Sequence, residues 1–565
     1  MLKLIPAVKE LRARDGKVTK RSVAPVDGIS DARLQKALAK LPVAPDGLAL
    51  SLCIGKDESE EYTLTLDAER VSITAGGARG AFYAIQTLRQ IFENDDVPCL
   101  TIHDKPDFSY RGFYHDVTRG KIATVKTIKN LVDTMARFKM NALQLYVEHV
   151  FEFEECRDLI DKTGYLTGAE IEEIDAYCKE NFIDFQPSLS TFGHLFELVQ
   201  QEKYQHLRVL KNFEEDACRW SDRMMHHTID PSAPESIEIV KHLIDQYAPH
   251  FTSKFFNVCC DETFDLKSSF PSEVEGKLYI DFVKKIIAHT KAKGKTAMMW
   301  ADILLQHPEY IGEIPDDVIF LNWTYRADPL EEGVAKLAEM GRKQIVCPGT
   351  TSWSRFCERV DREEPNITRL ADYGYKHGAL GVLNTNWGDW GNPASLETVA
   401  YGLVLGAAKS WAIDTAPGDA LDAAVNALLY KNPDAMRCLR RMSAAHNGVD
   451  WVKIMRAAHN RRAGIAYEAP ITKEDVATAQ DAYRELSAAL GAQDWREGDF
   501  KAEMLLAAEG ICVLAELGAK LADVKVKRLT DTKAFLARYR EKWLEKNKES
   551  ELTRIEDALL YAESV

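Results

Sequence analysis

The chain has 565 residues, which is too long for one compact core and predicts roughly two to four domains. Hydrophobic residues make up 46% of it and charged residues 28%, as in an ordinary soluble globular protein. The net charge of -15, without any run rich in Lys and Arg, argues against nucleic acid or an anionic membrane surface as a partner. A neutral or cationic substrate is compatible with this charge.

The N-terminal segment MLKLIPAVKELRARDGKV has no apolar run long enough for a signal peptide, and no later segment has the apolar length of a membrane span. The eleven cysteines are scattered and lack the paired spacing of a zinc site. We therefore expect free thiols in a cytoplasmic protein, with neither a metal ion nor another cofactor.

The first hundred residues combine strand-like and helical patterns. LALSLCIG and EYTLTLDAERVSITAG have the β-branched, alternating character of strands, and ARGAFYAIQTLRQIFEN has apolar residues at helical spacing. Residues 1–105 are therefore predicted to form a small α+β domain.

From residue 106 to residue 412, short apolar runs alternate with amphipathic helices, which is typical of βα units around a parallel sheet. Eight such units in this length predict a (β/α)8 TIM barrel. A doubly wound sheet is the alternative, but no Gly-rich phosphate loop follows the first strand. The predicted strands are Tyr110–Asp116, Ala142–Val147, Asp184–Leu189, Phe255–Cys260, Thr296–Trp300, Val318–Trp323, Gln344–Cys347 and Gly378–Asn384.

Residues 413–565 are rich in Ala, Leu, Lys and Glu at helical spacing, as in LDAAVNALLY and EMLLAAEGICVLAELGAKLADVK. This pattern predicts a C-terminal helical domain. Its apolar faces are expected to pack against the barrel, and the alternative is that they form a homodimer.

Two adjacent carboxylates, Asp261 and Glu262, follow the fourth predicted strand. Read alone, such a pair is typical of a helix N-cap and first turn. In a TIM barrel, however, residues just after the strands build the active site. Burying two unpaired anions is also costly, so the pair is expected in a site that uses both charges.

Aromatic residues gather at the same level, because five of the ten tryptophans follow the last four strands. Aromatic faces suit the apolar faces of a sugar ring, and carboxylates and Arg suit its hydroxyls. Paired carboxylates in a sugar pocket indicate glycoside hydrolysis, but consecutive residues do not readily flank one anomeric carbon. Another nucleophile is then needed, as in substrate-assisted enzymes that use the sugar's own 2-acetamido group. The five are Trp300, Trp323, Trp353, Trp387 and Trp390.

In order and spacing, these motifs resemble glycoside hydrolase family 20, the β-N-acetylhexosaminidases. The resemblance covers roughly residues 1–412 and includes the GAFYAIQTLRQIF helix and KMNALQLYVEH at the second strand. Its other motifs are Tyr110-Arg111-Gly112, Gly193-His194, Asp261-Glu262 and Trp387-Gly388-Asp389.

The resemblance implies a role for each matching residue. Glu262 acts as the general acid and then the base, and Asp261 orients the 2-acetamido group and stabilises positive charge. His194 supports Glu262. Arg111 binds the 3- and 4-hydroxyls, and Asp389 holds the 4-hydroxyl side.

The rings of Trp300, Trp323 and Trp387 are expected to wall the sugar. The sequence also departs from the family pattern, because Asn257-Val258-Cys259-Cys260 replaces the usual His-x-Gly-Gly and Glu148-His149 replaces an Asp after the second strand. The family's acetamido-binding Tyr is missing after the seventh strand, where Trp353 stands, and Tyr325 is the candidate substitute.

We therefore predict a divergent member of family 20 that removes terminal β-GlcNAc or β-GalNAc from an N-acetylhexosamine-containing glycan. It is expected to act at the non-reducing end of the glycan and to retain the anomeric configuration. Another 2-acetamido-sugar hydrolase, resembling family 84, is an alternative, although that family uses an Asp-Asp pair. An ordinary retaining β-glucosidase and a non-catalytic carbohydrate-binding relic remain as further alternatives.

Overall fold

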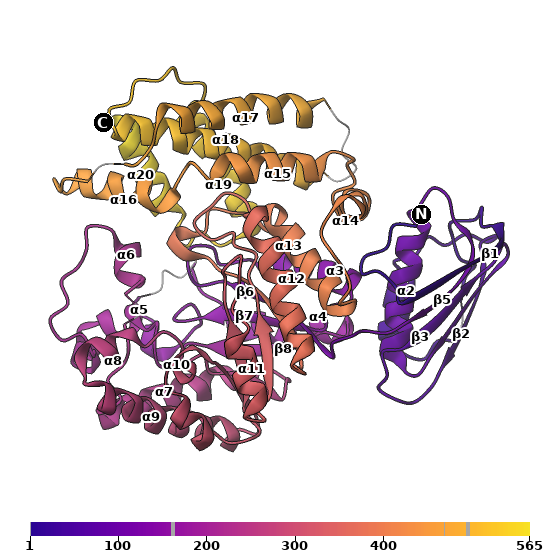
Figure 1. Ribbon diagram of the computed structural model, residues 1–565, viewed down its shortest axis with the longest axis horizontal. Helices are drawn as coiled ribbons and strands as arrows, with labels where there is room; N and C mark the ends of the chain where they lie inside the picture. Colours follow the sequence, from indigo (N-terminus) through magenta and orange to yellow (C-terminus); the bar gives the residue numbers. More distant parts are fainter. Residues whose placement is uncertain (1, 27, 160–163, 226, 468, 493–497) are drawn as a thin grey trace.

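The computed structural model describes residues 2–26, 28–159, 164–225, 227–467, 469–492 and 498–565. A small sheet region lies to one side of a central barrel, and a group of long helices lies along another side (Figure 1). Within the described ranges, we find no helix with both the length and the hydropathy that crossing a membrane requires.

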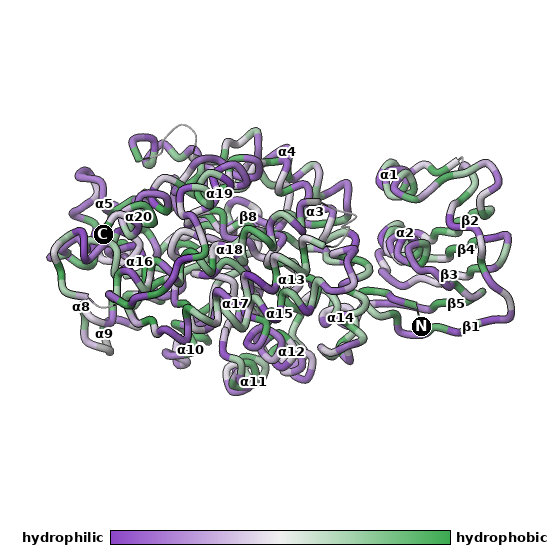
Figure 2. The backbone as a smooth tube through the Cα atoms, turned by 90° about the horizontal axis from the view of Figure 1, so that it is seen from above, coloured by the Kyte–Doolittle hydropathy of each residue, from purple (hydrophilic) through white to green (hydrophobic). Residues whose placement is uncertain are grey.

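The N-terminal region is a five-stranded sheet covered by helix α2, and Figure 2 shows it beside the barrel. Strand order is β1-β5-β3-β4-β2, with β2 and β4 parallel and the other pairs antiparallel. Alternate residues of β3 are buried, as expected for a sheet with one face against a helix. The elements are β1 (Glu10–Lys17), α1 (Ala32–Leu38), β2 (Ala49–Ile54), β3 (Tyr62–Leu66), β4 (Arg70–Ala75), α2 (Ala78–Phe92) and β5 (Pro98–Asp104).

Eight parallel strands close into a barrel, which confirms the predicted TIM-barrel class. β9 is shorter than predicted, because Cys259 and Cys260 adopt left-handed backbone angles that cannot continue a strand. The strands are β6 (Tyr110–Asp116), β7 (Ala142–Val147), β8 (Asp184–Leu189), β9 (Phe255–Asn257), β10 (Thr296–Trp300), β11 (Ile319–Trp323), β12 (Gln344–Cys347) and β13 (Gly381–Asn386).

Helices between the strands form the outer ring of the barrel. α4 begins with a capping box between Thr167 and Glu170. α9 ends just before Gly294, whose φ of 75° lies in the left-handed region that favours glycine. The α-helices are α3 (Val125–Arg137), α4 (Gly168–Glu180), α5 (Phe196–Gln200), α6 (Arg219–Arg223), α7 (Pro234–Tyr247), α8 (Phe264–Ser269), α9 (Ser272–Ala292), α10 (Asp302–Gln306), α11 (Glu332–Glu339), α12 (Val360–Lys376) and α13 (Ala400–Trp411). Short 3-10 turns are η1 (Glu154–Cys156), η2 (Glu202–Leu207), η3 (Ala248–His250), η4 (Pro308–Glu313), η5 (Asp389–Gly391) and η6 (Leu396–Val399).

The C-terminal helices surround α18 and pack on the barrel. Phe356, from a barrel loop, contacts the rings of Trp451, Phe535 and Tyr539. This is the packing that the apolar helix faces predict. The elements are α14 (Asp419–Val425), the π-helical turn η7 (Asn426–Tyr430), α15 (Ala435–His446), α16 (Trp451–Arg462), α17 (Lys473–Gly491), α18 (Gly498–Leu521), α19 (Thr532–Lys546) and α20 (Leu552–Ser564).

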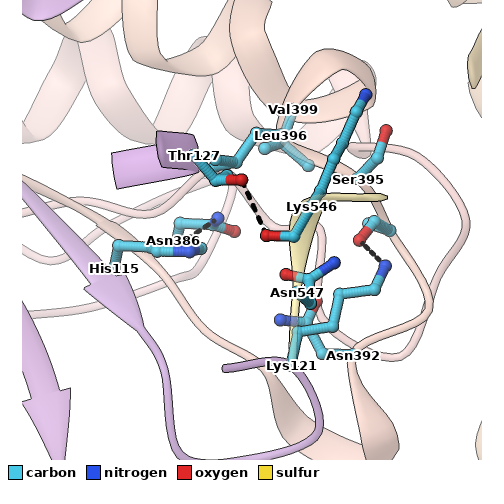
Figure 3. Close-up of a pocket in the computed structure, with 11 residues that line it drawn as sticks. His115, Lys121, Thr127, Asn386, Asn392, Ser395, Leu396, Val399, Lys546 and Asn547 are labelled. Atoms are coloured by element: carbon cyan, nitrogen blue, oxygen red, sulfur yellow. Dashed lines mark hydrogen bonds between the residues drawn. The ribbon is translucent and has the colours of Figure 1, made fainter. Parts of the chain in front are cut away.

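A small cavity of about 30 Å³ lies at this junction (Figure 3). Thr127 donates a hydrogen bond to the Lys546 carbonyl across the junction at 2.7 Å. Lys121 donates to the Pro393 carbonyl at 3.2 Å, and burial lowers the pKa of its amine to about 7. A cavity of this size suits one water molecule rather than a sugar, so we assign it a structural role.

Candidate active site

Asp261 and Glu262 lie on a tight turn that directly follows β9. Cys259, Cys260 and Glu262 have φ values of 57°, 66° and 48°, all in the left-handed region that side chains disfavour. The Trp300 N–H donates to the Cys259 carbonyl at 3.0 Å and ties the turn to β10. The Cys259 side chain is buried inside the barrel beside Tyr114 and Trp300, and that of Cys260 is buried against Thr191, while the carboxylates emerge at the C-terminal ends of the strands.

His194 joins the two carboxylates. Its Nε2 lies 3.4 Å from Asp261 Oδ2 and 3.3 Å from Glu262 Oε2. Burial opposes a charged imidazolium, but Asp261 and Glu262 outweigh it and raise the pKa of His194 well above its ordinary value. The Glu262 side chain is 22% exposed and that of Asp261 is 10% exposed, so Glu262 is the more accessible of the two.

A third carboxyl group, Asp302, lies behind this pair. Its Oδ2 accepts a hydrogen bond from the Glu262 N–H at 3.0 Å, which supports the left-handed turn. Burial, together with the negative charges of Asp261 and Glu262, raises the pKa of Asp302 to about 8. Asp302 is therefore protonated at neutral pH, which spares the site a third negative charge.

Asp302 gives a testable pH dependence of stability. An Asp carboxyl in the unfolded chain titrates near 3.9, so the raised folded pKa favours folding at low pH and this advantage is lost as pH rises from about 4 to about 8. Asp302→Asn keeps an acceptor for Glu262 but cannot ionise. The free energy of unfolding of the variant, relative to that of wild type, should therefore increase by on the order of a few kcal/mol as pH rises from 4 to 8. Urea unfolding at both pH values measures this difference, and a constant difference would contradict the assignment.

Arg119 and Asp389 form a second polar group at the same end of the barrel. The guanidinium of Arg119 is ion-paired with Asp389 and lies 2.7 Å from Asp116 Oδ2. Burial raises the pKa of Asp389 to about 6, although Arg119 opposes the shift. Asp116 also accepts a hydrogen bond from the Gly388 N–H at 2.9 Å, which fixes the loop that carries Asp389.

The prediction for Arg111 is wrong, because this residue lies at the opposite end of β6. Its side chain is completely buried between the barrel and the N-terminal region. It bonds to Glu60 at 2.7 Å, the Tyr83 hydroxyl at 3.0 Å and the Phe108 carbonyl at 2.8 Å. Arg119, which follows the end of the same strand, is the arginine that the site contains.

A matched pair of substitutions distinguishes the two arginines. Arg111→Met should lower the free energy of unfolding by about 3–5 kcal/mol, because it leaves the Glu60 carboxylate without its buried partner. Its kcat/KM per folded molecule should stay within about twofold of wild type. Arg119→Met should lower kcat/KM about 10- to 100-fold, as expected for losing a charged hydrogen bond to substrate. Equal losses of kcat/KM in both variants would refute this division.

Aromatic side chains at or just after the ends of β11, β12 and β13 lie close together. Trp323 stacks on Tyr325 with centroids 5.1 Å apart, and Tyr325 meets the ring of Trp353 edge-on at 5.0 Å. The Trp387 indole N–H donates to the Tyr325 hydroxyl at 2.6 Å. These rings form one continuous aromatic surface above the strand ends.

Trp300 lies one layer deeper than predicted. It is fully buried, with its ring centroid 5.3 Å from that of Tyr114 and 5.8 Å from that of Trp387. It therefore supports Trp387 from below rather than presenting a face to a ligand.

Glu148, which the sequence left undecided, lies close to His194. Burial alone would raise the pKa of its carboxyl, but a hydrogen bond with His149 and the charges of Arg223, Arg119 and His194 lower it to about 2. Tyr146 donates a hydrogen bond to Glu148 Oε1 at 2.9 Å. A permanent negative charge here stabilises the protonated form of His194.

Only one group of side chains in the described ranges could together hold a metal ion, namely His194, Asp261 and Glu262, whose ligand atoms lie within 4.8 Å of one another. A cation there would occupy both carboxylates of the turn. The arrangement, with an imidazole hydrogen-bonded between two acids, fits proton transfer better.

A closed (β/α)8 barrel with paired carboxylates, a histidine and an aromatic wall at its strand ends defines a glycoside hydrolase. The family model "Glycosyl hydrolase family 20, catalytic domain" matches residues 108–374, and "Glycosyl hydrolase family 20, domain 2" matches residues 1–105. The chain belongs to glycosyl hydrolase family 20.

Two relatives illustrate the similarity in sequence. A beta-hexosaminidase of Porphyromonas gingivalis is 26% identical over 361 residues, which cover 56% of this chain and 43% of that protein. Hexosaminidase D of Bos taurus is 27% identical over 217 residues, which cover 36% of this chain and 59% of that protein. The chain thus spans less than two thirds of the length of either relative.

Solved structures share the fold. The chitobiase of Flavobacterium johnsoniae superimposes with a TM-score of 0.61 at 18% identity, covering 95% of this chain and 96% of that one. A mutant beta-hexosaminidase of Streptomyces plicatus in complex with its product GlcNAc gives a TM-score of 0.59 at 20% identity, covering 78% of this chain and 95% of that one.

Proposed function

We propose that the protein is an exo-acting, retaining β-N-acetylhexosaminidase that uses the substrate's own acetamido group as nucleophile. The observation that carries the proposal is the adjacency of Asp261 and Glu262 on one turn, with His194 bonded between them. Two carboxyl groups placed this way approach the anomeric carbon from one side only. The nucleophile on the other side must then come from the sugar.

In the first step, Glu262 donates its proton to the glycosidic oxygen as the bond from that oxygen to C1 breaks. The acetamido carbonyl oxygen forms a new bond to C1, which gives an oxazolinium ion and a free leaving alcohol. Asp261 holds the acetamido N–H and stabilises the positive charge that develops there. His194, which lies between the two carboxyl groups, stabilises the negative charge of Asp261 and the charge that Glu262 acquires when it gives up its proton.

In the second step, the Glu262 carboxylate takes a proton from a water molecule, whose oxygen attacks C1 and opens the oxazolinium ring. The acetamido group is regenerated, and Glu262 is again protonated. Because C1 is inverted in each step, the product keeps the β configuration.

Substrate binding uses the other residues at the strand ends. Arg119 and Asp389 offer a forked donor and an acceptor for the sugar hydroxyls. Trp323, Trp353 and Trp387 offer ring faces, and we assign the acetamido carbonyl to the Tyr325 hydroxyl, which accepts a hydrogen bond from the Trp387 indole. The S. plicatus relative crystallised with GlcNAc supports this sugar class.

The proposal is tested with nitrophenyl β-glycosides of GlcNAc, GalNAc and glucose. The 2-acetamido sugars should be hydrolysed and the glucoside should not, and proton NMR should detect the β-anomer of the free sugar first. A GlcNAc-thiazoline, a stable mimic of the oxazoline, should inhibit strongly. Comparable hydrolysis of the glucoside, or release of the α-anomer first, would refute the mechanism.

A further inference from the structure

The C-terminal helices contact barrel loops that carry active-site residues, although these helices lie beyond the part of the chain that matches the family's catalytic domain. The loop with Asp389 also holds Trp390 and Asn392, whose φ values of 60° and 48° are left-handed. Such a backbone persists only where its surroundings hold it. The indole N–H of Trp451, in α16, donates to the Trp390 carbonyl at 2.8 Å, so the C-terminal helices help to fix this loop.

Glu551, the residue just before α20, joins the C-terminal helices to a second part of the active site. Its carboxylate accepts a hydrogen bond from the Trp220 indole of α6 at 2.9 Å and forms an ion pair with Arg223 at 2.7 Å. Its backbone N–H donates to the Gly120 carbonyl at 3.4 Å. Glu551, Trp220 and Arg223 are all buried, so water competes little for these polar contacts.

Arg223 extends this contact toward His194. Its guanidinium also lies 3.0 Å from the Glu197 carboxylate, so one buried arginine bridges Glu197 and Glu551. Glu197 comes three residues after His194, whose own φ of 58° is left-handed. A buried ion pair holds its partners in place, because breaking it leaves a charge without compensation. The chain from Glu551 through Arg223 to Glu197 therefore constrains the segment that carries His194.

The charge of Arg223 acts on the same site. Burial opposes this charge, but nearby carboxylates, above all that of Glu551, outweigh it and raise the pKa of Arg223. Arg223 in turn helps to keep Glu148 ionised, beside His194. If Glu551 lost its charge, the positive charge of Arg223 would be less balanced and would disfavour the protonated imidazole of His194.

We propose that Glu551 is a positioning residue, which acts through Arg223 to hold His194 between the two carboxyl groups of the catalytic turn. This inference rests on the proposed function, because it concerns the same site. Through its backbone N–H, Glu551 also holds Gly120, the residue after Arg119. The C-terminal helices are then part of the catalytic apparatus as well as a domain packed on the barrel.

The first test replaces Glu551 by Gln in the full-length protein. Gln keeps the size of the side chain but cannot form the ion pair with Arg223. For nitrophenyl β-GlcNAc, kcat per folded molecule should fall about tenfold, since small displacements of catalytic groups have effects of this order or larger. KM should change by less than about threefold, because the contact with Gly120 comes from the backbone and remains.

The matched control is Glu556→Gln, on α20 itself. It removes an ion pair with Arg540 of α19, at 2.6 Å, within the C-terminal helices. This variant should change kcat by less than about twofold. A kcat in Glu551→Gln equal to that of wild type, or an equal fall in both variants, would overturn the inference.

A double-mutant cycle tests whether Glu551 acts through Arg223. Arg223→Gln should also lower kcat, and Arg219 still pairs with Glu197 in this variant. Adding Glu551→Gln to Arg223→Gln should then change kcat by less than about twofold. Losses that multiply in the double variant would show that the two residues act independently, and the inference would be wrong.

NMR titration of His194 gives a readout that needs no turnover and that a loss of stability alone would not move. Its pKa should be lower in Glu551→Gln than in wild type, by about half a pH unit for one charge lost several ångströms away. Glu556→Gln should leave it unchanged. An unaltered pKa in Glu551→Gln would refute the inference, whether or not Arg223→Gln folds. If the pKa falls as expected but wild type cleaves no 2-acetamido glycoside, the proposed function fails and the link from Glu551 to His194 stands.

Discussion

Replacing Glu262 by Gln should lower kcat/KM for a nitrophenyl β-N-acetylhexosaminide by about 10²- to 10⁴-fold, the range that general acid–base catalysis contributes. Gln keeps the size and hydrogen-bonding capacity of the side chain but cannot donate the proton to the leaving oxygen. The loss should be smaller for a dinitrophenyl leaving group, which departs without protonation. Steady-state rates with both leaving groups measure the difference.

The control for this variant is Glu339→Gln, which changes an exposed glutamate of α11 far in sequence from the turn. It should leave both rates unchanged. Unaltered turnover in Glu262→Gln, or an equal loss with both leaving groups, would show that another residue is the acid.

Replacing Asp261 by Asn should lower kcat about 10²- to 10³-fold, the range observed for removing one group that stabilises developing charge. The affinity for a GlcNAc-thiazoline should also fall, because Asn cannot balance the positive charge of the oxazolinium ring that the inhibitor mimics. A structural readout accompanies these losses. Among the groups that raise the pKa of His194, Asp261 contributes most, so NMR titration should find this pKa lowered in the variant.

Two outcomes would contradict the role given to Asp261. One is a thiazoline affinity equal to that of wild type, which would mean that the carboxylate does not act on the acetamido group. The other is an unchanged pKa of His194, which would mean that the side chains do not interact in solution as they do in the structure.

The barrel could be predicted because apolar runs that alternate with amphipathic helices indicate which side chains of each element are buried. The end of β9 was not predictable in the same way. Val258, Cys259 and Cys260 are apolar enough for a strand, yet the left-handed angles of the two cysteines end β9 at Asn257. Backbone conformation of this kind depends on what surrounds the turn, including the bond from Asp302 to Glu262.

The family motif led to Arg111 as the substrate-binding arginine, whereas the position of each residue along the first predicted strand favours Arg119. Asp116 and Arg119 both stood at the end of the first predicted strand, whereas Arg111 stood at its start. Since the active site of such a barrel lies at the C-terminal ends of the strands, Arg119 was the better candidate from sequence. The partners of Arg111, Glu60 and Tyr83, come from the N-terminal region, and no local pattern in the sequence indicates this contact.

The residues that support Asp261 and Glu262 could not be identified from the sequence. Asp302 and Glu148 become relevant only when their strands lie beside β9 and His194 in three dimensions, because each acts through burial and charge. The sequence likewise predicts Trp300 as one of the rings around the sugar, but the structure shows it fully buried beneath Trp387. The carbohydrate prediction was sound because it depended on several rings rather than on any one of them.

The central claim, that the substrate supplies the nucleophile, is tested most directly with nitrophenyl β-glucosaminides whose acetamido group carries zero, one, two or three fluorine atoms. Fluorine withdraws electrons from the carbonyl oxygen and weakens it as a nucleophile without changing the leaving group. We predict that kcat falls steeply with each added fluorine. A kcat that does not change across the series would show that the acetamido oxygen does not attack C1, and would contradict the proposed mechanism.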